Sequence, residues 1–275
     1  MDVLKSISTP VKEKSVRLIQ ISDCHLGSGD SESLLGLDTD RSLSDVLTLI
    51  AAEHRRIDWL VCTGDITSSG DNDGYSRFVK TVRQHFSAPL AWLPGNHDSA
   101  AAMANIQADE LPESRVILLD NGLVILLDSS VPGEVYGELE ATELEFLQKT
   151  LTRYPDKHVM VMLHHQPVPV GSAWIDAYIL RNAADFFAII DGNPRVKTVV
   201  WGHVHQQFMG QRKHITLLGS PSTSVQFKPG CDDFTVDTSM PGYRWFDLGA
   251  DGSFETGVSR VMAQDYPIDY QSGGY

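Results

Sequence analysis

The sequence has few cysteines, few basic residues and no long hydrophobic run. Its cysteines, Cys24, Cys62 and Cys231, form an odd and scattered set without a C-x-x-C pair, which predicts neither a disulfide framework nor a zinc finger. No stretch reaches the length of a membrane-spanning helix, and residues 1–15 contain no apolar core of a secretory signal. These absences predict a cytoplasmic protein without a membrane partner.

Basic residues are outnumbered by acidic ones, and 22 Lys and Arg against 36 Asp and Glu give a net charge of −14. A nucleic-acid-binding surface needs clustered basic charge, so no such partner is expected. The same net charge repels a phosphate unless divalent cations in the site supply positive charge locally. A P-loop and a dinucleotide fingerprint are absent too, because Gly27-Ser28-Gly29 is followed by neither a third glycine nor G-K-[ST].

The composition is that of a folded protein with a sizeable core, since 42% of the 275 residues are hydrophobic and 21% are charged. No repeat, low-complexity tract or long linker divides the chain, and one domain over residues 1–275 is expected. Short apolar runs of strand length alternate with segments of helical periodicity, as in α/β proteins. The expected strands are Val16–Ser22, Asp58–Thr63, Leu90–Leu93, Val116–Leu119, Leu123–Asp128, His158–Leu163, Val196–Trp201, Ile215–Leu218, Tyr243–Leu248 and Phe254–Val261.

Local sequence patterns also predict a hairpin turn, a helix cap and five helices. Asn121-Gly122 predicts a tight two-residue turn in a hairpin, and Thr142-x-x-Glu145 is typical of a capping box at the start of a helix. The expected helices are Ser42–His54, Asp73–Phe86, Ala100–Ala108, Thr142–Arg153 and Asn182–Ile190.

Polar side chains follow five of the expected strands at the point where each strand ends. Open α/β sheets bind their ligands at the carboxyl ends of their strands. The sequence G-N-H-D alone is also typical of a turn or a helix cap, but one shared site explains five such strand ends better than five independent accidents. The groups are Asp23 with His25, Asp65, Asn96 with His97, His164, and His203 with His205.

These groups are carboxylates, an amide and imidazoles, without a thiolate. Nitrogen and oxygen ligands together suit Fe, Mn or Zn better than Mg or Ca. Seven of these side chains, all except His97, are too many for one four-coordinate ion and suit two ions that share a carboxylate. Two ions roughly 3.5–4 Å apart stabilise both the attacking and the leaving oxygen of a phosphoryl displacement. The sequence therefore predicts a dinuclear hydrolase that acts on phosphoesters.

The order of the motifs D-x-H, G-D, G-N-H-D, H-H-x-P and G-H-x-H resembles that of the calcineurin-like metallophosphoesterases. The resemblance implies an α/β (α+β) fold, a double β-sandwich flanked by α-helices. It also implies that the C-terminal segment, about 221–275, packs on the sandwich near the site.

The resemblance further implies a role for each motif residue. Asp23, His25 and His205 would bind the first ion, and Asn96, His164 and His203 the second. Asp65 would bridge the two ions, and His97 would stabilise charge on the phosphate or donate a proton to the leaving oxygen. The residues implied in substrate binding are His25, Asp65, Asn96, His97 and His205.

From Leu18 to the C-terminus the chain also resembles the bacterial class III 3′,5′-cyclic AMP phosphodiesterases. The segments that carry this resemblance are Leu34–Ser42 and Pro221–Pro229, continuing to Phe234–Asp237. It implies hydrolysis of cyclic AMP to 5′-AMP, two divalent ions (Fe²⁺, Mn²⁺ or both) and a lowered concentration of this second messenger. Gln166 stands where the family more often has a third consecutive histidine, but the ligand position His164 is kept.

Two other functions stay open at this point. The metal motifs are shared with broad phosphodiesterases, which act on glycerophosphodiesters or other small diesters. The fold could also serve as a non-catalytic scaffold, although a scaffold tolerates the loss of a ligand and none is missing here. No protein partner can be inferred from the sequence.

Several residues have two interpretations. His165 either orients the site or packs in a loop, and Cys24 is expected to fill space in the core. Four residues either contact the phosphate, ribose or base or only brace loops, namely Arg41, Arg181, Asn182 and Phe227. The remaining histidines are expected to be surface or strand residues, namely His54, His85, His158 and His214.

Overall fold

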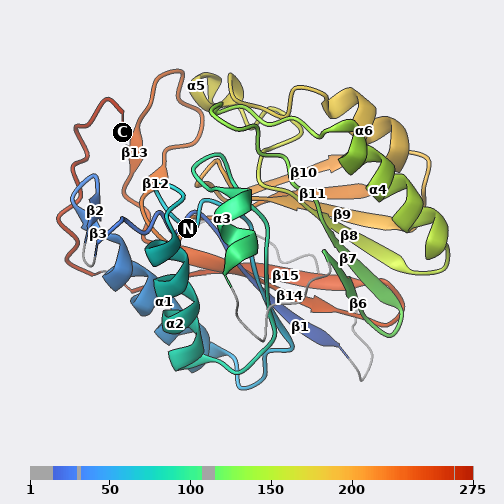
Figure 1. The fold of residues 1–275 in the computed structure, drawn as a ribbon, viewed down its shortest axis with the longest axis horizontal. Coiled ribbons are helices and arrows are strands. Elements are labelled where there is room, and N and C mark those ends of the chain that lie inside the picture. The colour runs from blue at the N-terminus through green and yellow to red at the C-terminus, as the bar shows by residue number, and fades with distance from the viewer. Residues whose placement is uncertain (1–14, 30–31, 107–114, 263, 275) are drawn as a thin grey trace, which may run out of the picture.

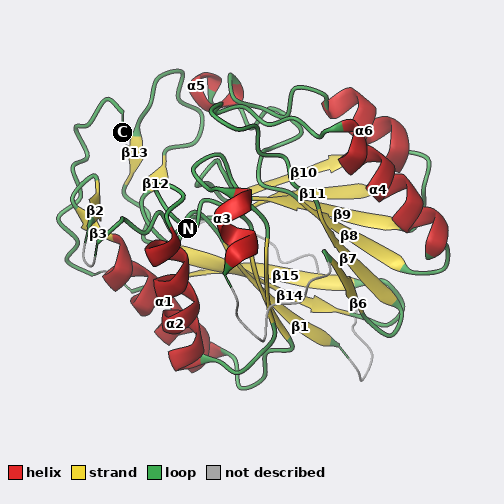
Figure 2. Ribbon diagram, viewed as in Figure 1, coloured by secondary structure: helices red, strands yellow, loops and turns green. Residues whose placement is uncertain are grey.

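Two mixed β-sheets lie face to face, and helices cover the outer face of each (Figures 1 and 2). This computed structural model describes residues 15–29, 32–106, 115–262 and 264–274. Within these ranges no helix combines the length and the apolar character that crossing a bilayer requires. The α/β class and the flanked double sheet predicted from the sequence are confirmed.

The first sheet has the strand order β15-β14-β1-β4-β5. Its three parallel strands β1, β4 and β5 come from the N-terminal part of the chain, and the C-terminal strands β14 and β15 add to its edge in antiparallel fashion. The bounds are β1 Val16–Ile21, β4 Trp59–Cys62, β5 Leu90–Trp92, β14 Gly242–Leu248 and β15 Phe254–Arg260.

The second sheet has the order β10-β11-β9-β8-β7-β6, with a parallel centre and an antiparallel strand at each edge. Its bounds are β6 Val116–Leu118, β7 Gly122–Leu126, β8 His158–Met162, β9 Val196–Trp201, β10 Phe208–Arg212 and β11 Ile215–Gly219. Two small ribbons complete the β-structure, β2 Ser33–Leu34 with β3 Leu37–Asp38 and β12 Gln226–Phe227 with β13 Val236–Asp237.

The helices form the two outer layers. In Figure 2, α1 and α2 lie beside the first sheet, and α4 and α6 lie on the side of the second sheet that is turned away from the first. The bounds are α1 Thr39–Glu53, α2 Asn72–His85, α3 Ala100–Asn105, α4 Ala141–Arg153, α5 Ala173–Asp176 and α6 Ala183–Ile190. The end of the predicted helix Ala100–Ala108 lies outside the described residues.

The period of two along a strand explains why three hydrophobic cores form. In β1, Leu18 points into the core between the sheets, whereas Ile19 and Ile21 point toward α1 and α2. In β4, Val61 faces the other sheet and Leu60 faces the helices. Strands buried on both faces appear in the sequence as continuous apolar runs, which is typical of parallel sheets.

Three local predictions need correction or refinement. Helix α1 starts three residues earlier than expected, because the Asp38 side chain accepts a hydrogen bond from the Arg41 N–H at 2.9 Å and caps the helix. The capping box predicted for α4 is absent, since Glu140 is its N-cap and makes no side-chain capping bond. The β6–β7 hairpin forms, but Asn121-Gly122 is not a primed turn because neither residue has a positive φ.

Candidate metal centre

The predicted site residues meet at one end of the sandwich. Each lies just beyond the carboxyl end of a parallel strand: β1, β4 and β5 in the first sheet, and β8 and β9 in the second. The structure brings together, in four overlapping groups, all the histidines and aspartates of the predicted ligand set, and Asn96 contacts this cluster through His164.

The first group contains Asp23, His25 and His205, whose ligand-type atoms lie within 4.8 Å of one another. His205 Nε2 lies 3.4 Å from Asp23 Oδ1 and 3.1 Å from His25 Nε2. All three side chains are buried. These are the three residues that the sequence assigned to one ion.

The second group is centred on His164. Its Nε2 lies 3.2 Å from Asn96 Oδ1 and 3.2 Å from Asp65 Oδ2. His203 joins the same group, and its buried Nε2 has no hydrogen-bond partner among the described residues. A buried nitrogen without a partner costs free energy, so this one is suited to a ligand that the chain itself does not supply.

Asp65 has neighbours in both of these groups. It forms one group with Asp23 and His164 and another with His25 and His97, in each case with ligand-type atoms within 4.8 Å. Its Oδ2 lies 3.8 Å from His25 Nε2 and 3.2 Å from His164 Nε2, so this one oxygen faces proposed ligands of both ions. The geometry therefore fits the bridging role expected of Asp65.

Hydrogen bonds behind the ligands orient the imidazoles. Thr63 O accepts from His164 Nδ1 at 2.8 Å, and Val225 O accepts from His205 Nδ1 at 2.8 Å, so each Nε2 faces the centre. Such outer contacts fix the tautomer and ring direction of metal ligands. His165 uses both ring nitrogens on Ser129 Oγ and Val135 O, at 2.9 and 3.1 Å, which favours an orienting role over a ligand role.

The backbone at the site is strained. Seven described non-glycine residues have a positive φ, and five of them are Asp23, His25, Asp65, His203 and His205, with φ between 47° and 61°. Asp23 and His25 are therefore not extended as residues within a strand are, and left-handed backbone conformations direct their side chains into the centre. Strained residues of this kind cost about 1–3 kcal/mol each and cluster at functional sites.

The pKa values of the imidazoles and carboxylates in the site also favour the binding of cations. Burial lowers the pKa of His25 to about 3 and, together with neighbouring His165, holds that of His203 well below its usual value, so both imidazoles keep a lone pair. Burial opposes charge on Asp65, but His164 outweighs it and holds the pKa of this carboxyl well below its usual range. Without an ion, burial opposes charge on His164, but the carboxylate of Asp65 outweighs it and raises the pKa of His164 to about 9, so a bound cation would displace this proton. With His164 deprotonated, the imidazoles and the charged carboxylates form a nitrogen and oxygen donor set that fits Fe, Mn or Zn.

His97 lies beside the cluster rather than within its buried part. Its backbone N–H donates to Asp65 Oδ1 at 2.9 Å, and its ring Nδ1 lies 3.2 Å from Ser68 O. Its ring packs edge-on against that of His25, with centroids 4.9 Å apart. A half-buried imidazole in this position can reach a substrate held at the ions.

Asp98, the last residue of G-N-H-D, has a role that its motif did not predict. Its carboxylate accepts hydrogen bonds from Gly95 N at 2.9 Å, from Ile66 N and Thr67 N, and from Tyr75 Oη at 3.0 Å. It thereby ties the loop after β4 to the loop after β5. The signal was present, because Asp is a common partner of backbone N–H groups in turns.

Bracing contacts are present at all four residues for which contact with a nucleotide or bracing of loops was expected. Asn182 exchanges two hydrogen bonds with the backbone of Leu139, at 2.9 and 2.7 Å. Phe227 is buried and stacks on His205. The guanidinium groups of Arg41 and Arg181 lie over the rings of Tyr266 and Tyr136. Cys24 is buried in the core, as expected.

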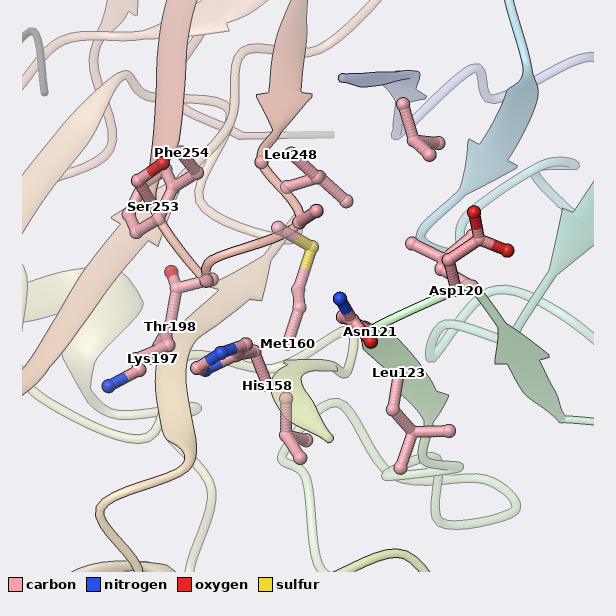
Figure 3. Close-up of a pocket in the computed structure, with 17 residues that line it drawn as sticks. Asp120, Asn121, Leu123, His158, Met160, Lys197, Thr198, Leu248, Ser253 and Phe254 are labelled. Carbon is pink, nitrogen blue, oxygen red and sulfur yellow. The ribbon is translucent and has the colours of Figure 1, made fainter. Parts of the chain in front are cut away.

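A cavity of about 140 Å³ lies at the other end of the strands (Figure 3). His158 and Lys197, near the starts of β8 and β9, line it together with apolar Met160 and Phe254. None of the predicted site residues lines this cavity, so it is separate from the metal centre.

Gly95 lets the two loops of the centre approach closely. A Cβ on Gly95 would lie 2.1 Å from Asp65 Oδ1 and 2.5 Å from Asp65 N, and the backbone atom cannot swing away. We expect Gly95→Ala to displace Asp65 and weaken Mn²⁺ binding about tenfold or more, as measured by titration calorimetry. Gly192→Ala is the control, since a Cβ there meets no atom within 4 Å; equal affinity in both variants would contradict this expectation.

The comparisons with known proteins agree with this geometry. The family model described as calcineurin-like phosphoesterase matches residues 16–207. The 3′,5′-cyclic adenosine monophosphate phosphodiesterase CpdA of Pseudomonas aeruginosa is 42% identical over 268 residues, covering 98% of each chain. The protein of the same name from Escherichia coli K12 is 39% identical over 265 residues, covering 96% of each chain.

Solved structures support the fold at much lower identity. A dimetal phosphatase from Danio rerio superimposes with a TM-score of 0.60 at 14% identity, covering 90% of this chain and 99% of that one. The family and the fold predicted from the strand-end motifs are confirmed: this chain belongs to the calcineurin-like phosphoesterase family.

Proposed function

We propose that this protein is a 3′,5′-cyclic AMP phosphodiesterase that hydrolyses cyclic AMP to 5′-AMP at a dinuclear metal centre. The observation that carries the proposal is the place of Asp65, whose carboxylate forms one group of donors with Asp23 and His164 and another with His25 and His97. The substrate is taken from the relatives, because the two CpdA phosphodiesterases align with nearly the whole chain. Activity on cyclic AMP would lower this second messenger in the cytoplasm.

The ligands divide between two ions. The first ion would be held by Asp23, His25 and His205, the second by Asn96, His164 and His203, and Asp65 would be shared between them. Fe²⁺, Mn²⁺ or both are the proposed occupants, since the donors are mixed and include no thiolate. Once bound, two such ions supply Lewis-acid charge and lower the pKa of water at the site.

The side chains around the ions bind and orient the substrate. The residues that would contact the substrate are His25, Asp65, Asn96, His97 and His205. His97 stands at the edge of the cluster, with its backbone held by Asp65, its Nδ1 beside Ser68 O and its ring against that of His25. It donates a proton to the leaving 3′ oxygen, and this proton transfer relieves the negative charge that develops there.

The first experiment removes the metal and restores it. Metal-stripped protein is reloaded separately with Fe²⁺, Mn²⁺, Zn²⁺ or Mg²⁺, and the turnover of cyclic AMP, cyclic GMP and glycerophosphocholine is measured. We expect formation of 5′-AMP that depends on added metal, with Fe²⁺ and Mn²⁺ the most effective. Activity on glycerophosphocholine without turnover of cyclic AMP would assign the centre to a broad diesterase. Inactivity on every diester would leave a scaffold.

A further inference from the structure

The segment Ser220–Phe227, which follows β11, is buried along its whole length. It lies beyond residue 207, where the match to the family model ends, so the metal motifs shared by the family do not include it. Nevertheless it contacts Asp23 and His205, which are two of the three ligands proposed for the first ion.

On one side, the segment fixes the backbone of Asp23. Ser222 Oγ donates to Asp23 O at 2.7 Å, and Ser224 Oγ donates to the same oxygen at 3.1 Å. The N–H of Thr223 donates to Ser22 O at 3.0 Å. Because Asp23 has a φ of 56°, an unfavourable value for a residue with a Cβ, these bonds hold its carbonyl in a conformation that it would otherwise leave.

On the other side, the segment fixes the ring of His205. Val225 O accepts from His205 Nδ1 at 2.8 Å, which sets the tautomer. The ring of Phe227 stacks on the imidazole with a centroid distance of 4.1 Å and an interplanar angle of 9°. A single hydrogen bond leaves a ring free to tilt, whereas a stacked neighbour fixes its plane. Together they direct His205 Nε2 toward Asp23 Oδ1, 3.4 Å away.

Phe227 can act in this way because it is itself held. Trp174 and Phe234 pack edge-on against its ring, with centroids 5.0 and 5.3 Å away. The segment is also tied to α1 through Ser42 Oγ, which donates to Thr223 O at 2.6 Å, and to β15 through Arg260, whose guanidinium donates to Gln226 Oε1 at 2.9 Å.

From this arrangement we propose that Phe227 is a positioning residue, which sets the affinity of the first metal ion by holding the His205 ring, while Ser222 and Ser224 do the same for Asp23. The proposal rests on the proposed two-ion function and adds to it a part of the chain that the family motifs leave out. It predicts that metal binding depends on an aromatic side chain that touches no ion.

A buried phenylalanine also stabilises a core, so the test needs a control of equal burial. Phe186 on α6 supplies it, because it is fully buried in the core of the second sheet and contacts no proposed ligand. Phe227→Leu and Phe186→Leu remove the same atoms from equally buried places. Both are expected to lower the melting temperature of the metal-free protein, and only the first to change metal binding.

The experiment is a titration of the metal-free full-length protein with Mn²⁺, followed by calorimetry and electron paramagnetic resonance. We expect two ions per chain in the wild type. Phe227→Leu should weaken one of them about 10–100-fold, the usual effect of losing an outer contact of a metal ligand. The exchange-coupled signal of the Mn²⁺ pair should then give way to that of single ions at stoichiometric loading, and Phe186→Leu should leave it unchanged.

The outcomes separate the inference from the proposed function. If Phe227→Leu binds both ions as tightly as Phe186→Leu does, the positioning role is overturned and the dinuclear enzyme stands. If the wild type itself binds fewer than two ions, the proposed function fails. Should Phe227→Leu not fold, Ser222→Ala tests the same segment without opening a large cavity. It should weaken the first ion several-fold, whereas Ser253→Ala, which loses only a contact to Asp251, should not.

Discussion

The substitution Asp65→Asn is expected to lower kcat/KM for cyclic AMP about a thousandfold or more, a loss of roughly 4 kcal/mol of transition-state stabilisation. Asp65 Oδ2 lies 3.8 Å from Nε2 of His25, a proposed ligand of the first ion, and 3.2 Å from Nε2 of His164, a proposed ligand of the second. An asparagine that keeps its oxygen on the N–H of His97 places an NH₂ group, which cannot bind a cation, where Oδ2 of Asp65 faces both sides of the centre. Its oxygen can still accept the N–H of His97, so the fold should be retained.

The measurement combines steady-state kinetics with the metal content of each variant and a circular dichroism spectrum. We expect fewer than two ions per chain in Asp65→Asn and an unchanged spectrum. Asp191→Asn is the matched control, because it neutralises a carboxylate that pairs with Arg212 at 2.8 Å and lies outside the metal centre. Two bound ions together with turnover within tenfold of the wild type would contradict the bridging role.

The positions of the ligands were predictable because they depend on strand ends. In parallel sheets buried on both faces, strands appear as apolar runs, and the residue after each run is placed at the carboxyl edge. Asp65, directly after T-G at the end of β4, is an example. Its neighbours in space follow β1, β5 and β8, and the end of each of these strands can be recognised in the sequence.

The backbone conformations and contacts that direct the ligand side chains toward the centre could not be predicted from the sequence. Nothing in D-C-H indicates that Asp23 and His25 adopt left-handed backbones, since only tertiary contacts such as the Ser222 hydroxyl stabilise them. The stack of Phe227 on His205 joins residues 22 apart with no periodic signal between them. The edge strand β10 was also missed, because F-M-G-Q-R has neither a continuous apolar run nor a clear alternation.

Replacing His97 by Ala is the second change with a large expected effect. His97 is a proton donor in the proposed mechanism and holds neither ion, so His97→Ala should retain two ions per chain while kcat for cyclic AMP falls about 10²–10³-fold. Asn96→Ala should differ by losing metal as well, because Asn96 contacts His164 within the second group. His214→Ala, which removes an exposed imidazole, is the control and should leave both quantities unchanged.

Two substrates with different leaving groups distinguish between proton donation and charge stabilisation by the His97 imidazole. The 3′ oxygen of cyclic AMP leaves as a strongly basic alkoxide unless it is protonated, whereas p-nitrophenolate is stable without a proton. If His97 donates the proton, His97→Ala should lose about tenfold or less on bis(p-nitrophenyl) phosphate, far less than on cyclic AMP. An equal loss on both substrates would show that the imidazole stabilises charge on the phosphoryl oxygens instead, because those oxygens are common to the two diesters. Full activity on both would exclude His97 from the chemistry and leave its backbone N–H, which holds Asp65, as its contribution.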